Sequence, residues 1–103
     1  MKFDTIVTFV DMYSLTDNKT GELRPYARVT LQTPIQKTEK NPYAFGTKGT
    51  DFTVDSKYYE KFKSIYTKGT KINVVLDVKP TIDQISKKHY LKYYIKAVDG
   101  VEL

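Results

Sequence analysis

The sequence predicts an all-β protein with one helix, in the element order β-β-β-α-β-β. Five segments are rich in β-branched and aromatic residues, and several of them alternate apolar with polar side chains, as a strand with one buried face does. One segment, 56–67, instead repeats its apolar residues at helical spacing. Turn-forming Asp, Asn, Gly and Pro residues punctuate the chain between several of these segments.

The first two strands are expected at 3–13 and 24–33. Imperfect alternation in the first strand indicates a bulge near Ile6–Val7. A turn at 16–21 separates the strands, because its Asp, Asn and Gly residues favour local hydrogen bonds and positive φ. The second strand alternates cleanly and predicts a buried face of Ala27, Val29, Leu31 and Thr33 opposite a wet face of Tyr26, Arg28, Thr30 and Gln32.

Residues 34–50 form the longest irregular stretch, because prolines and glycines interrupt any regular pattern there. A loop of this length in a small domain is usually functional or disordered. It carries lysines together with the aromatic residues Tyr43 and Phe45, and it is expected to fold partly into a hairpin. A short third strand follows at about 50–54.

The only helix is expected over 56–67. Asp55 is a suitable N-cap, since its carboxylate can accept hydrogen bonds from the first free amides of the helix. Gly69 can supply the left-handed residue that closes the helix. The apolar stripe includes Phe62 and Ile65, and this stripe is expected to face the core.

The last two strands are expected at 70–79 and 89–98, joined by a connection at 80–88. The first points Ile72, Val74, Leu76 and Val78 inward. In the second, alternation separates an apolar set, His89, Leu91, Tyr93, Ile95 and Ala97, from a second set, Tyr90, Lys92, Tyr94, Lys96 and Val98. The apolar set is predicted to face the core.

This order of five strands with one helix between the third and fourth is that of the oligonucleotide/oligosaccharide-binding (OB) fold, a five-stranded, partly open antiparallel barrel. In that arrangement the helix closes one end of the barrel. A curved antiparallel sheet packed on one helix is the alternative. With 103 residues, one domain spanning 1–103 is expected.

Composition narrows the class of protein. The absence of cysteine excludes disulfides and thiolate chemistry, and no apolar run approaches the length of a membrane span. The N-terminus reads as a strand and not as a signal peptide, so a cytoplasmic protein is expected. The chain holds 17 Lys and Arg against 12 Asp and Glu, a net charge of +5, which favours polyanionic partners.

Nothing in the sequence indicates an enzyme. The single histidine, His89, lies in the apolar set of its strand, where a structural role is the usual one. There is no metal-ligand spacing, no phosphate-binding glycine loop and no nucleophile motif. We therefore expect no catalytic residue, no metal, no cofactor and no small-molecule substrate.

The aromatic and basic residues do indicate a binding surface. The chain has nine Tyr and five Phe residues but no Trp, and tyrosine alternates with lysine on the fifth strand. Single-stranded nucleic acid is bound by such surfaces, because bases stack on the rings and lysine or arginine contacts the phosphates. The predicted nucleic-acid-binding residues are Tyr26, Arg28, Tyr43, Phe45, Lys48, Tyr90, Lys92, Tyr94 and Lys96, and the fourth strand adds Lys71, Asn73 and Lys79.

DNA is the expected ligand and RNA remains open. The alternative function is a protein-interaction module, such as an inhibitor or assembly factor encoded by a phage or mobile element, that uses the tyrosine-rich face. Tyrosine is enriched in protein interfaces, but lysine is depleted at their centres, and this favours nucleic acid.

The stretches "RPYARVTLQT", "YAFGTKGTDF" and "HYLKYYIKAV", with a capped helix between them, resemble small single-stranded-DNA-binding proteins of phages and conjugative elements, of the helix-destabilising type. The resemblance implies a β-barrel whose Tyr and Phe rings stack on bases, often in a homodimer that coats DNA during replication or transfer of a mobile element. The filamentous phage proteins lack so definite a helix, which leaves the subfamily open.

Overall fold

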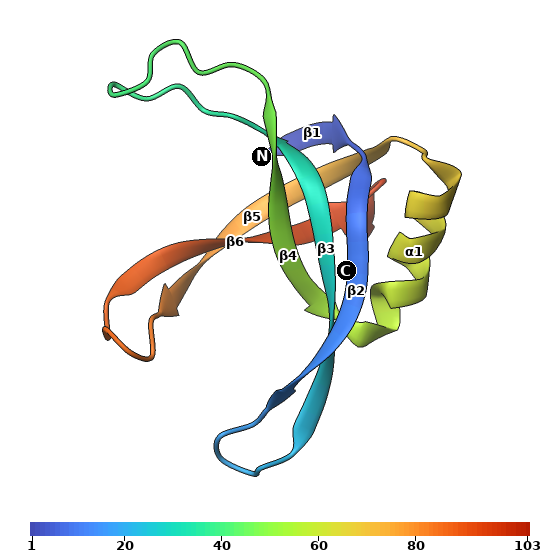
Figure 1. The fold of residues 1–103 in the computed structure, drawn as a ribbon, viewed down its shortest axis with the longest axis vertical. Helices are drawn as coiled ribbons and strands as arrows, with labels where there is room; N and C mark the ends of the chain where they lie inside the picture. The colour runs from blue at the N-terminus through green and yellow to red at the C-terminus, as the bar shows by residue number, and fades with distance from the viewer. The chain divides into compact units, whose positions relative to one another are not determined.

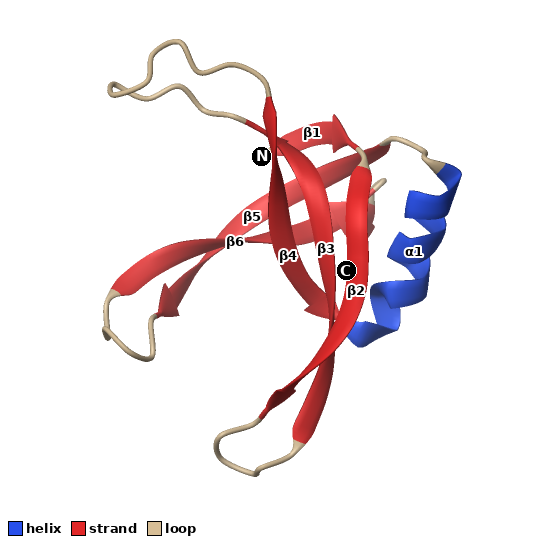
Figure 2. Ribbon diagram, viewed as in Figure 1, coloured by secondary structure: helices blue, strands red, loops and turns tan.

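The computed structural model describes residues 1–103, which form β-strands and one α-helix (Figures 1 and 2). The strands pair in a three-stranded sheet, in the order β2-β3-β4, and a four-stranded sheet, in the order β1-β5-β6-β7. Each sheet belongs to one of two compact units, Thr5–Lys71 and the remainder of the chain. The prediction of an all-β protein with one helix is confirmed, but seven strands in two sheets replace the expected five. One domain over 1–103 stays a prediction.

The three-stranded sheet consists of β2 (Val7–Thr16), β3 (Leu23–Pro34) and β4 (Thr47–Asp55), with β3 in the centre. Both pairings are antiparallel. The predicted alternation of β3 is confirmed, because its inner residues are buried and its outer residues are half-buried. The buried residues are Ala27, Val29, Leu31 and Thr33.

The β2–β3 turn lies where the sequence predicts it. The Asp17 carboxylate accepts a hydrogen bond of 2.8 Å from the amide of Lys19 and a longer one from the amide of Thr20. Gly21 has a φ of 73°, which glycine adopts without strain. The bond from the Lys19 amide is the main reason that the pKa of Asp17 lies below its ordinary value of 3.8.

The loop between β3 and β4 is shorter than predicted. Strand pairing continues to Pro34 and Thr47, so β4 begins before the expected residue 50 and the irregular segment spans 35–46. The amide of Ile35 donates to the carbonyl of Gly46 at 2.9 Å and closes the loop at its base. The expected hairpin is therefore confirmed, and its loop projects beyond the ends of both strands (Figure 1).

The predicted helix is confirmed, with one refinement at its start. Residues Ser56–Tyr58 form a 3-10 turn, η1, and α1 spans Tyr59–Lys68. The Asp55 carboxylate caps the turn by accepting from the amide of Lys57 at 3.0 Å. Gly69 ends α1 with a φ of 65°. The helix packs along β2 and is not of the length and apolar character that crossing a bilayer requires.

The first predicted strand, 3–13, proves to be two strands. β1 (Lys2–Thr5) belongs to the four-stranded sheet and β2 to the three-stranded sheet, with Ile6 between them. The pairing of β2 with β3 shifts between Val7 and Phe9. The irregularity expected near Ile6–Val7 is therefore present, and it marks the point where the chain passes from one sheet to the other.

In the four-stranded sheet, β5 (Ile72–Ile82) pairs with β6 (His89–Val98) from Val74 to Ile82, and β7 (Val101–Glu102) is a short edge. A turn at 83–88 joins β5 to β6. Its Asp83 carboxylate accepts from the amides of Ile85 and Ser86, and these bonds, that of Ser86 first, lower the pKa of Asp83 below 3.8. We call the part of this hairpin from Asp77 to Lys96 the β-arm (Figure 2).

Only two of the five residues predicted to form the core face of β6 are buried. Ile95 and Ala97 are buried as expected, but His89, Leu91 and Tyr93 are exposed, and so is Val78 across from Tyr93. The pairing of β7 with β6 covers only Ala97 and Val98, so no third strand lies on that edge of the arm. Tyr93 consequently keeps 49% of its surface exposed.

Val98 is buried, although alternation placed it outward. Leu76 pairs with Ile95 and Val75 pairs with Ala97, which leaves Lys96 as an extra residue in β6. Such a bulge reverses the alternation of the residues that follow it. Val98 therefore lies on the same side as its buried partner Val74, and Ala97 lies on the side of Val75.

Candidate nucleic-acid interface

One face of the β-arm gathers the tyrosines and lysines of β6. Antiparallel partners lie on the same side of a sheet, so the register of β5 with β6 adds three residues of β5 to this face. We call it the lysine–tyrosine face; its members are Asp77, Lys79, Thr81, Tyr90, Lys92, Tyr94 and Lys96.

Two lysines lie directly opposite each other at the centre of this face. Lys79 and Lys92 are cross-strand partners, and like charges in this position repel each other. The Lys79 ammonium nitrogen lies 5.5 Å from the centroid of the Tyr94 ring, a cation–π contact. A ring does not neutralise the positive charge of Lys79, and no ion pair of the chain includes Lys79 or Lys92. An anion bound here would relieve the repulsion between the two lysines.

The lysine–tyrosine face has one carboxylate for three lysines. The Lys96 ammonium and the Asp77 carboxylate are 3.9 Å apart, and each side chain is 48% exposed. An exposed pair at this distance contributes little to stability and leaves both groups available to other partners. Three lysines less one aspartate leave a charge of +2 on the face.

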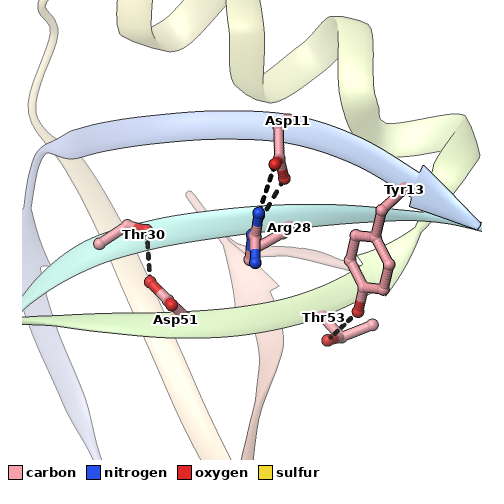
Figure 3. A network of polar contacts seen from close by, with 6 residues as sticks. All are labelled: Asp11, Tyr13, Arg28, Thr30, Asp51 and Thr53. Carbon is pink, nitrogen blue, oxygen red and sulfur yellow. Dashed lines mark hydrogen bonds and ion pairs between the residues drawn. The ribbon is translucent and has the colours of Figure 1, made fainter.

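A second set of predicted residues lies on the outer face of the three-stranded sheet, where Arg28 is already paired. Its Nε and Nη2 atoms donate to the two carboxylate oxygens of Asp11 at 3.1 and 2.5 Å (Figure 3). This bond is the main cause that raises the pKa of Arg28 above its ordinary value. We call the surface the arginine–aspartate face; its members are Phe9, Asp11, Tyr13, Tyr26, Arg28, Thr30, Asp51 and Thr53.

Further contacts fix the side chains of the arginine–aspartate face. Thr30 Oγ1 donates to Asp51 Oδ1 at 2.5 Å, and the hydroxyls of Tyr13 and Thr53 are 2.9 Å apart (Figure 3). The Tyr13 and Tyr26 rings lie 6.2 Å apart. Hydrogen bonds within the sheet therefore engage the side chains of Asp11, Tyr13, Arg28, Thr30, Asp51 and Thr53.

Both arginines of the chain are paired with a carboxylate. Arg28 stands over the rings of Phe9 and Tyr13, at 5.7 and 5.5 Å from their centroids, while it binds Asp11. Arg24 lies 3.2 Å from the Asp17 carboxylate. Phosphate binding by these arginines would have to displace a carboxylate, which is not the case for Lys79 or Lys92.

The three remaining predicted residues lie in or beside the 35–46 loop. Tyr43 and Phe45 are 91% and 92% exposed, so neither ring packs on the protein. Lys48 pairs with Thr33, on the inner side of the sheet, and its side chain therefore projects from the face opposite to Arg28. Lys48 does not share a face with Tyr26 and Arg28.

The predicted residues thus fall into three sets. Tyr90, Lys92, Tyr94 and Lys96 share one face, as the alternation of β6 predicts. The register adds Lys79 to them. Tyr26 and Arg28 share a second face, and the loop residues form a third group.

The sequence reasoning missed Asp11, Phe9 and Tyr13 on the arginine–aspartate face. These residues are spaced two apart in one strand, which predicts that their side chains share a face. No sequence pattern predicts that Asp11 lies opposite Arg28.

No three His, Asp or Glu side chains of the chain are grouped so that they could hold a metal ion. Comparison of the chain with protein-family models, with curated proteins and with solved structures finds no match. The functional interpretation therefore depends on the geometry of the faces themselves.

Proposed function

We propose that the protein binds single-stranded DNA, with little dependence on sequence, through the lysine–tyrosine face of the β-arm. The observation that supports this most is the pair of facing lysines, Lys79 and Lys92, without a carboxylate partner and between the rings of Tyr90 and Tyr94. Phosphates would neutralise the lysines, and bases would stack on the tyrosines.

The spacing on β6 suits an extended single strand. Tyr90 and Tyr94 are four residues apart on one face, which corresponds to about 13 Å along a strand. Lys92 lies midway between them, so two stacked bases would flank a phosphate contact. Duplex DNA is a poor ligand for this surface, because its bases are not free to stack on side chains and the face has no helix to enter a groove.

We also propose that β1 and β2 act together as the first strand of an OB-like barrel, with β3, β4, β5 and β6 as the other four. The single helix between β4 and β5 and the antiparallel hairpins on either side of it support this assignment. The break at Ile6 is where one long strand would bend to serve both sheets. An experimental structure in which β4 or β6 lies too far from the other strands for a partly open barrel to form would refute this assignment.

In the cell, we propose a cytoplasmic protein that coats single strands during replication or transfer of a phage or other mobile element. Homodimerisation and binding to RNA are part of the same proposal and can be measured separately. The resemblance of the sequence to helix-destabilising proteins supports this role.

The proposed function is tested by fluorescence anisotropy with labelled oligo-dT, an RNA of the same length and a duplex. We expect oligo-dT to bind in the micromolar range or more tightly and the duplex at least about tenfold more weakly. Equal affinity for duplex and single strand would refute stacking as the mode of binding.

A second candidate function is a protein-interaction module. The opposite side of the arm supports it, because Leu91, Tyr93 and Val78 are exposed apolar side chains in one row. If Lys92→Ala and Tyr94→Ala bind oligo-dT as the unmodified protein does, the tyrosine-rich arm is more consistent with a protein partner.

A further inference from the structure

A groove between α1 and β2 is separate from the β-arm. It has a volume of about 340 Å³, within the range of ligand-binding pockets. Both of its walls belong to the unit Thr5–Lys71, and α1 lies along β2 in Figure 1. It is lined by Thr8, Phe9 and Val10 of β2 and by Tyr59, Lys63, Tyr66 and Thr67 of α1.

The helical wall follows from the sequence. Residues 59, 63 and 66 are spaced by four and three positions, which places their side chains along one stripe of the helix. Phe62, on the neighbouring stripe, is fully buried and anchors α1 to the sheet. The stripe with Tyr59, Lys63 and Tyr66 is thereby held at the rim of the groove.

The strand wall lies at the irregularity of β2. The register with β3 shifts between Val7 and Phe9, and a bulge changes the direction of the side chains around it. Three consecutive residues of β2, Thr8, Phe9 and Val10, line the groove. Phe9 is 47% exposed and Tyr66 is 53% exposed, so both rings have surface to offer a ligand.

The groove has one cation and no counter-ion. The Lys63 ammonium lies 5.7 Å from the centroid of the Tyr59 ring, and none of the ion pairs of the chain includes Lys63. The segment 56–68 holds four lysines and a single acidic residue, Glu60. A ligand that complements this groove needs an apolar or aromatic part for the rings and one negative charge for Lys63.

We propose that this groove binds a short acidic segment of a partner protein, with an aromatic side chain between Phe9 and Tyr66 and a neighbouring carboxylate on the Lys63 ammonium. Single-stranded nucleic acid fits less well, because its repeated phosphates would find only one lysine in the lining.

This inference does not depend on DNA binding. Its residues lie on β2 and α1, and those of the proposed DNA site lie on β5 and β6. Variants of the arm, such as Tyr94→Ala, are expected to leave peptide binding unchanged. The failure of either proposal can therefore be recognised without the other.

The test is titration of the full chain with a short synthetic peptide in which one phenylalanine is flanked by glutamates, followed by amide NMR. We expect the signals of Phe9, Lys63 and Tyr66 to shift, and we expect Lys63→Ala to weaken binding by about tenfold, as for loss of one charge-assisted hydrogen bond. The matched control is Lys57→Ala. The Lys57 ammonium makes the same kind of contact, 5.2 Å from the Tyr58 ring, outside the groove.

Three results would overturn the proposal. The first is no shift of the groove signals at roughly millimolar peptide. The second is equal binding of a peptide with lysines in place of the glutamates, or equal binding by Lys63→Ala. The third is displacement of the peptide by oligo-dT with shifts in the groove, which would assign this surface to nucleic acid.

Discussion

The arginine–aspartate face and the lysine–tyrosine face carry the same kinds of side chain and differ in how their charges are matched. On the first, Arg28 is held by both oxygens of Asp11, and the nearby hydroxyls bond to one another. On the second, Lys79 faces Lys92, and the only carboxylate, that of the exposed Asp77, lies 3.9 Å from Lys96. The charged Arg28 of the first face is paired within its own strands, whereas Lys79 and Lys92 of the second have no carboxylate partner.

This difference shows that the number of basic residues on a strand is a poor measure of its affinity for phosphate. A guanidinium bound to a carboxylate must give up that partner before it can bind a phosphate, whereas a lysine beside another lysine gains from the same contact. For this reason we place the main site on the arm, and we expect Tyr26 and Arg28 to contribute less.

The largest effect is expected for the double substitution Lys79→Glu and Lys92→Glu. Reversal of both charges should weaken oligo-dT binding by about 100-fold, because two phosphate contacts become repulsive. The control is Lys19→Glu with Lys57→Glu, which changes the net charge equally at exposed residues that are not part of the arm. If both double variants lose affinity equally, net charge and not the arm governs binding.

A smaller effect is expected when a single ring is removed from each face. Tyr94→Ala should weaken oligo-dT binding by about 1–3 kcal/mol, the contribution of one stacked base. Tyr26→Ala should have a weaker effect on affinity, since its ring already lies beside Tyr13 and the neighbouring Arg28 is held by Asp11. Anisotropy titrations of the two variants decide the comparison, and a larger loss for Tyr26→Ala would move the main site to the three-stranded sheet.

Asp11→Asn should make the arginine–aspartate face resemble the lysine–tyrosine face, because it leaves Arg28 without its carboxylate partner. Without the carboxylate, Arg28 loses its ion pair and becomes available to phosphate, so oligo-dT affinity should rise slightly, by about twofold. A small fall in Tm is expected from the lost pair. Asp51→Asn is the control, because Asp51 binds Thr30 and not Arg28. A fall in affinity for Asp11→Asn alone would indicate that the ion pair shapes a binding surface.

The smallest effect is expected for the turns of the β2–β3 and β5–β6 hairpins. The pKa values of Asp17 and Asp83 lie below 3.8 because backbone amides stabilise their carboxylates. A lowered pKa contributes stability at pH values above 3.8 that is lost as the pH falls through the folded-state pKa. Asp17→Asn with Asp83→Asn should therefore show a smaller decrease in Tm in acid than the unmodified protein. An identical decrease would show that other groups control acid unfolding.

The elements with local signals could be predicted from the sequence. The alternation of β3, the Asp55 cap, the Gly69 closure and the Asp17 turn each depend on residues close together in the chain. The shared face of Tyr90 and Tyr94 is also local, since it follows from alternation within one strand.

What could not be predicted depends on pairing between distant segments. The bond from Arg28 to Asp11 and the opposition of Lys79 to Lys92 follow from strand register, which the alternation of single strands does not determine. Tyr93 was expected in the core, because alternation cannot show where neighbouring strands stop and an arm becomes exposed. Val98 was placed outward because the extra residue Lys96 left no mark in the pattern.

The most direct test of the central claim is the salt dependence of oligo-dT binding, measured for the unmodified protein and for Lys79→Ala with Lys92→Ala. Each phosphate contact contributes about −0.7 to the slope of log affinity against log salt for single strands, so three lysines predict a slope of about −2. The double variant should retain about a third of that slope. An unmodified protein with a slope near zero, or a double variant with an unchanged slope, would contradict the assignment of phosphate binding to the lysine–tyrosine face.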